Sequence, residues 1–214
     1  NTSTQPIRAA IVELIRSSGS TLATTTTDSN GAFALTAPAS TSVFIRVKAQ
    51  SRKTSTPTRN IRVLDNTGGN ALYVLDSAVF DSGTANQVKN LHAASGWGGT
   101  SYTGVRAAAP FAILDTLVTA TDFVVDNGNS SVDLPGLDVF WSPLNNASSG
   151  DVTRGQIEST LYRTASATGP AGSWRRCRGT CSGWPSWAGL RPELWINVAV
   201  VKLLSLGTKP AAPV

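Results

Sequence analysis

Short alternating stretches of apolar and polar residues, separated by turn signals, fill residues 5–88 and constrain the fold more than any other feature. In SVFIRVKAQ (42–50), Val43, Ile45 and Val47 fall on one side of an extended chain, because strand side chains alternate with period two. We expect that side to face the core. Short strands with turn signals every 8–12 residues or so predict a β-sandwich.

Further stretches of the same kind occur on both sides of this one. Each is rich in β-branched or aromatic residues, which suit a half-buried pleated surface. Each is bounded by Gly, Pro, Asn or Ser, which interrupt regular structure. The predicted strands are IRAAIVELI (7–15), TLATTTT (21–27), AFALTAP (32–38), RNIRVLD (59–65) and NALYVLDSAVF (70–80).

The tetrapeptide DSNG (28–31) predicts a tight turn between two of these strands. Asp28 can hydrogen-bond the following backbone, and Asn30 and Gly31 tolerate a positive φ. The same letters superficially resemble the start of a calcium-binding loop. Such a loop needs Glu at its twelfth position, and Ala39 stands there. We therefore interpret the motif as a structural turn, without a metal.

The run TTTTDSNGAFAL (24–35) resembles the hairpin of carboxypeptidase-regulatory-like domains, which are also called transthyretin-like or prealbumin-like. The resemblance implies that Asp28 and Gly31 make the turn and that Phe33 enters the core. It also implies a mainly β, prealbumin-like sandwich over residues 5–88, of the kind that accompanies secreted or surface enzymes.

The character of the sequence changes after a Gly-rich linker at 89–103. RAAAPFAILDTLVTATDFVVDNG (106–128) carries apolar residues at helical spacing. Pro110 is tolerated in a first helical turn, and Asn127-Gly128 is a plausible helix end. LDVFWSP (137–143) predicts a buried strand ended by proline. Helix followed by strand indicates an incomplete α/β segment over 104–171.

A second resemblance covers LHAASGWGGTSYTGVRAAAPFAILDTL (91–117) and LDVFWSP (137–143). Both are similar to exported bacterial proteins that place such a sandwich before a zinc metallopeptidase domain. The resemblance implies an extracellular or cell-envelope location and a non-catalytic accessory role. The partner would be the protein's own catalytic domain. His-Glu-x-x-His, which would ligate zinc there, is absent, so we expect no enzymatic activity from this chain.

Residues 172–214 depart from the family pattern. Residues 1–171 carry equal numbers of basic and acidic side chains, whereas 172–214 carry the whole net charge of +5. This tail also holds both cysteines, Cys177 and Cys181, in an irregular, Trp-rich context. We hypothesise that it is a frameshifted or grafted terminus, and whether its cysteines are bridged stays open. Because the basic charge is confined to the tail, we expect no nucleic-acid partner for the rest.

Trp97 and Tyr102 are the candidate ligand-contacting residues. They lie in SGWGGTSYTG (95–104), where aromatic rings among glycines can stack on sugars. The alternative is that they pack between the β-rich region and the α/β segment. An alternative function for the chain is therefore an extracellular binding module for a carbohydrate or a surface protein.

Other constellations predict no catalytic or cofactor site. His92 is the only histidine, and no nucleophile motif accompanies it. Asp115 and Asp138 could form a carboxylate pair only if the fold brings them together. No apolar run reaches the 18 or so residues that a membrane-spanning helix needs.

Overall fold

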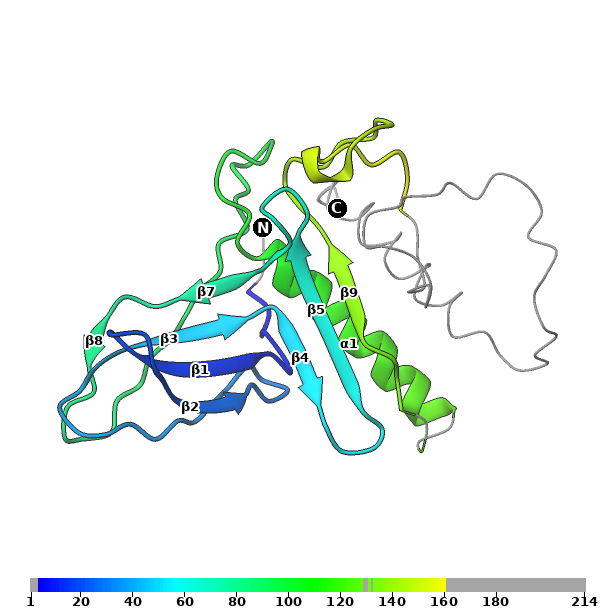
Figure 1. Ribbon diagram of the computed structural model, residues 1–214. Coiled ribbons are helices and arrows are strands. Elements are labelled where there is room, and N and C mark those ends of the chain that lie inside the picture. Colours follow the sequence, from blue (N-terminus) through cyan, green and yellow to red (C-terminus); the bar gives the residue numbers. More distant parts are fainter. Residues whose placement is uncertain (1–3, 129–130, 132, 161–214) are drawn as a thin grey trace.

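The computed structural model describes residues 4–128, 131 and 133–160 (Figure 1). This part of the chain consists mainly of strands in antiparallel sheets, with one long helix. The elements are β1 (Ile11–Arg16), β2 (Thr21–Thr26), β3 (Ser42–Lys48), β4 (Gln50–Lys53), β5 (Arg59–Asp65), β6 (Ala71–Leu72), β7 (Val74–Asp76), β8 (Phe80–Asp81), α1 (Ala109–Asn127), β9 (Leu137–Phe140) and the short 3₁₀ helix η1 (Val152–Arg154).

The first sheet, called sheet A here, has the strand order β2-β1-β3-β7, and β8 also pairs with β3. All of its pairings are antiparallel. Val43, Ile45 and Val47 of β3 are buried, whereas the residues between them are partly exposed. The predicted orientation of this strand is confirmed, because only one face of sheet A packs against the core.

The second sheet, sheet B, is built around β5. β4 and β6 pair antiparallel with β5, and β9 pairs parallel with it, Ile61 opposite Leu137 and Leu64 opposite Phe140. Helix α1 packs on β5 and β4 (Figure 1). β5, α1 and β9 therefore form a parallel crossover unit. The predicted segments on either side of the linker share one sheet.

The two sheets meet at a junction of three backbone segments. Ala49 separates β3 from β4, and Tyr73 separates β6 from β7. The N–H of Ala49 donates to the C=O of Tyr73 (2.8 Å), Tyr73 donates to Val63 (3.1 Å), and Val63 donates back to Ala49 (2.9 Å). This closed ring of hydrogen bonds lets two chain segments pass from sheet A to sheet B with their peptide groups satisfied.

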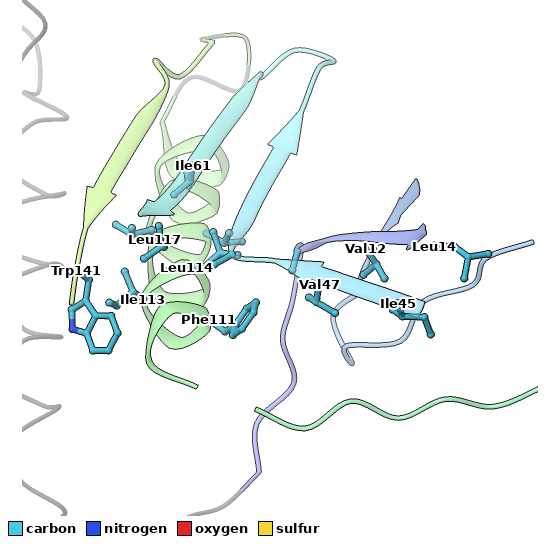
Figure 2. Close-up of a cluster of buried hydrophobic side chains, with 14 of the residues drawn as sticks. Val12, Leu14, Ile45, Val47, Ile61, Phe111, Ile113, Leu114, Leu117 and Trp141 are labelled. Carbon is cyan, nitrogen blue, oxygen red and sulfur yellow. The ribbon is translucent and has the colours of Figure 1, made fainter. Parts of the chain in front are cut away.

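One hydrophobic cluster extends under both sheets (Figure 2). Val12, Leu14, Ile45 and Val47 line its part below sheet A. Its other part surrounds α1 and contains the buried side chains Ile61, Phe111, Ile113, Leu114, Leu117 and Trp141. The α1 residues recur at helical spacing, so the predicted amphipathic face is the face that packs on sheet B.

One predicted strand is wrong. Residues 32–38 form no strand and pair with no ladder. The Asp28 turn and Pro38 bound this segment, which does not join the edge strand β2. Phe33 and Leu35 are partly buried against the cluster. The alternation in the sequence thus reflects side chains that cover the core. The segment itself has no hydrogen-bonded partner strand.

The boundaries of the long helix agree closely with the sequence. α1 runs from Ala109 to Asn127, with Pro110 in its first turn and Gly128 as its C-cap. Within the described residues, no helix combines the length and the apolar character that crossing a membrane requires.

Candidate functional site

The carboxyl ends of the parallel strands β5 and β9 lie side by side at one end of sheet B (Figure 1). We call this end of the strands the carboxyl edge and define it as residues 65–67 and 141–145. α1 runs in the opposite sense between the two strands, so its N-terminus lies toward the same edge. Ligands of open α/β sheets bind at the carboxyl ends of strands. The carboxyl edge is therefore a candidate ligand site.

A chain of polar side chains connects the ends of the two strands. Asp65 Oδ1 accepts hydrogen bonds from the N–H (2.9 Å) and the hydroxyl (2.8 Å) of Thr67. The Thr67 hydroxyl lies 2.7 Å from the hydroxyl of the buried Ser142. Tyr73 donates its hydroxyl to the C=O of Trp141 at 3.1 Å. These contacts join β5 to the segment after β9 through side chains as well as through the ladder.

The titration of this cluster follows from its contacts. Partial burial acts to raise the pKa of Asp65, but hydrogen bonds from Thr67 and Gly68 outweigh it, so the net pKa is lowered. Burial and the neighbouring Asp65 charge both raise the pKa of Tyr73 well above its ordinary value. At neutral pH the pair therefore consists of a carboxylate and a neutral phenol, without an acid–base couple near pH 7.

We expect Asp65→Asn to weaken the loss of stability in acid. A carboxyl group with a lowered folded-state pKa stabilises the fold above its ordinary pKa of 3.8 and loses that contribution as pH falls below it. Urea unfolding from pH 7 to pH 2 should show the largest gap between wild type and variant at pH 7, closing below about pH 4. A gap that is constant across this range would contradict the assignment.

Asn66 is a buried amide beside this cluster, with 4% of its surface exposed. Its Nδ2 donates to Asn145 Oδ1 (2.8 Å) and to the C=O of Val152 (2.6 Å). Its Oδ1 has no hydrogen-bond partner among the described residues. These two hydrogen bonds of Asn66 therefore hold the loop that carries η1 against the end of β5.

Trp97 and Tyr102 face each other across a small hairpin at 95–104, which we call the aromatic hairpin. Their rings make an edge-to-face contact with centroids 5.1 Å apart. Gly96 has a φ of +73°, and a Cβ there would lie 2.6 Å from the C=O of Gly104. A residue with a side chain is therefore excluded at this close backbone approach.

Arg106 connects the aromatic hairpin to the carboxyl edge. Its guanidinium carbon lies 4.1 Å from the ring centroid of Tyr102 and 5.2 Å from that of Trp141. Trp141 in turn contacts Tyr73, with centroids 5.6 Å apart. The rings and the cation form one continuous series of contacts, so the hairpin packs on the end of β9. Tyr102 keeps 41% of its surface exposed in this arrangement.

The structure separates the other candidate residues. Asp115 on α1 forms a bidentate ion pair with Arg8, at 2.6 and 2.9 Å. Asp138 pairs with Arg62 on the neighbouring strand, at 2.6 and 2.7 Å. The two carboxylates therefore belong to different ion pairs. His92 lies exposed in the connection between β8 and α1.

The DSNG motif forms the predicted turn. Asp28 Oδ1 accepts the N–H groups of Asn30 (2.8 Å) and Ala32 (2.9 Å), and Gly31 has a φ of +76°. Among the residues that the structure describes, no three His, Cys, Asp or Glu side chains gather as metal ligands would. Cys177, Cys181 and the rest of the predicted tail lie outside the described residues.

Comparison with protein-family models, curated proteins and solved structures gives no match for this chain. Sequence reasoning missed Asp65, Asn66, Arg106 and Trp141. The available signal was the polar run Asp-Asn-Thr directly after one strand and Trp-Ser directly after another.

Proposed function

We propose that this chain is a non-catalytic accessory region of an exported zinc metallopeptidase-like protein. In this proposal sheet A, with the turn at Asp28 and the partly buried Phe33, is the prealbumin-like sandwich. Sheet B is the beginning of the catalytic part. The chain contains no His-Glu-x-x-His, so zinc and catalysis would come from the catalytic domain of the same protein.

The observation that carries the proposal is the outer edge of β9. The N–H of Trp141 donates to the C=O of Leu64 on β5 (2.9 Å). Peptide groups alternate in direction along a strand, so the N–H groups of Asp138 and Phe140 point away from β5. Among the described residues, β9 pairs with β5 alone. An open strand edge presents unpaired peptide groups and accepts a further strand.

The exposed side chain of Phe140 favours the same conclusion. Phe140 has 44% of its surface exposed on the open strand, and a neighbouring strand would cover part of it. The resemblance to metallopeptidase-associated proteins implies that a strand follows this segment. Such a strand, added to β9, would place the catalytic part next to the carboxyl edge.

The proposal is tested by sequencing the DNA that encodes residues 165–214 and translating all three frames. A His-Glu-x-x-His helix in another frame is the expected result. Its absence from every frame, and from the DNA that follows, would remove the metallopeptidase part of the proposal.

We also expect hydrogen exchange to identify the open edge. In the 1–214 chain, the amides of Asp138 and Phe140 should exchange quickly, whereas those of Val139 and Trp141 should be protected by β5. In a chain with the frame restored, Asp138 and Phe140 should become protected. Leu14, in the central strand β1, is the control and should be protected in both chains. Equal, rapid exchange of the two β9 amides in the restored chain would contradict strand addition.

A second candidate function is ligand binding at the aromatic hairpin. The specific observation is the edge-to-face pair of Trp97 and Tyr102, because Tyr102 keeps 41% of its surface exposed. Whichever ring supplies the edge, such a pair occupies at most one face of Trp97. Aromatic faces of this kind stack on the apolar faces of sugars. This function is compatible with an accessory region that retains an exported enzyme near its substrate.

A further inference from the structure

The charge of Arg106 is not balanced by the protein around it. Four other arginines, Arg8, Arg46, Arg59 and Arg62, each contact a carboxylate at 2.5–2.7 Å. The Arg106 side chain makes no hydrogen bond or ion pair with any residue in 4–128 or 133–160, and its Nε is buried without a partner. A guanidinium held partly out of water is normally paired with an acid.

The two aromatic contacts of Arg106 hold it in place without neutralising it. Its contacts with Tyr102 and Trp141 supply cation–π attraction. They also restrict the side chain before an anion arrives, which reduces the entropy lost on binding. Because Nε is enclosed by the protein, a carboxylate would be bound through the two Nη groups.

We propose that Arg106 binds the carboxylate of a uronic acid residue in an acidic polysaccharide. The proposal rests on ligand stacking at the aromatic hairpin. Trp97 and Tyr102 supply the apolar surface for a sugar ring, and Arg106, 4.1 Å from the Tyr102 centroid, supplies the adjacent cation. Arg binds carboxylates through two parallel charge-assisted hydrogen bonds. A neutral sugar would leave this charge unpaired.

A glycan fits this surface better than an acidic peptide. The site offers aromatic rings and a single cation, and residues 1–171 have no net charge to attract a polyanion at long range. One carboxylate beside one flat apolar face is the pattern of a uronic acid. The hairpin itself contributes only an isolated bridge, so an extended peptide could pair only with the edge of β9, away from the two rings.

The test uses the 1–214 chain and two polymers with the same backbone, polygalacturonate and its fully methyl-esterified form. Affinity is measured by titration calorimetry in about 0.15 M salt, which screens weak contacts with the basic tail. We expect polygalacturonate to bind at least tenfold more tightly than the ester. Arg106→Gln should remove this difference, whereas Trp97→Ala should weaken binding of both polymers.

The matched control is Arg52→Gln, which removes the same charge from an exposed arginine on β4. It should leave both affinities unchanged. An equal loss in Arg52→Gln and Arg106→Gln would overturn the proposal in favour of non-specific charge attraction. Tight binding of polyglutamate would overturn the glycan assignment. If Arg106→Gln fails to fold, the affinities for the acid and the ester are compared in the wild type and in Arg106→Lys instead. The preference for the acid should be smaller in Arg106→Lys, because lysine lacks the planar fork of arginine.

The outcomes also separate this proposal from the function on which it rests. Equal affinity for the acid and the ester, lost in Trp97→Ala, would keep ligand stacking and overturn the role of Arg106. No binding of either polymer would overturn both.

Discussion

Replacing Leu114 with alanine is expected to lower the free energy of unfolding by about 2–5 kcal/mol. Leu114 lies in the middle of the buried face of α1 and is fully buried between the helix and sheet B (Figure 2). Its neighbours come from several elements, including Ile61 on β5. These elements cannot all move inward, so the substitution leaves a cavity. Urea unfolding of the 1–214 chain, followed by far-ultraviolet circular dichroism, measures the change.

Val88→Ala is the control for this substitution. Val88 is 87% exposed in the connection before the aromatic hairpin, so its change in stability should stay within about 0.5 kcal/mol. Similar losses for the two variants would contradict the packing of α1 on sheet B. A large loss for Leu114→Ala alone would support it.

Trp141→Ala is expected to cost about 3–5 kcal/mol. The indole is buried at the end of β9 and contacts Tyr73 and Arg106. Its removal deletes the largest side chain of the carboxyl edge and exposes the stacked guanidinium to solvent. We expect the aromatic hairpin to detach from β9 as well. The ring resonances of Tyr102 should therefore shift in nuclear magnetic resonance spectra.

Phe123→Ala is the matched aromatic control, because Phe123 on α1 is 56% exposed. It should cost about 1 kcal/mol or less and leave the Tyr102 resonances in place. If Trp141→Ala lowers the stability no more than this control, the contacts of Trp141 with Tyr73 and Arg106 do not stabilise the fold. If Tyr102 is unaffected, the hairpin is held by other contacts.

The sequence was most informative where one face of an element is buried. Val43, Ile45 and Val47 were predicted to share the core face, and α1 was predicted almost to the residue. Both patterns follow from periodic burial, which a sequence records directly. The segment at 32–38 has the same alternation because Phe33 and Leu35 contact the core. Its backbone pairs with no strand, and a side-chain pattern carries no information on pairing.

Long-range pairing was the part that the sequence could not supply. It predicted helix followed by strand after residue 104, but not that β9 would lie beside β5. The pairing depends on hydrogen bonds between peptide groups, which are identical for all residues other than proline. The site shows the same limit. Trp97 and Tyr102 stood out as aromatic residues among glycines, whereas Arg106 is distinguished only in space, where its side chain pairs with no acid of the described part of the chain.

The parallel pairing of β5 with β9 has a consequence for synthesis of the chain. Ile61 cannot form this pairing until Leu137, its partner 76 residues later in the sequence, has been synthesised. At bacterial and eukaryotic elongation rates of about 5–20 residues per second, this delay lasts about 4–15 s. During that interval the nascent chain presents one unsatisfied edge of β5, together with the apolar face that α1 later covers. RNIRVLD (59–65) is therefore the segment that a ribosome-associated chaperone for extended apolar chains would be expected to bind during this interval.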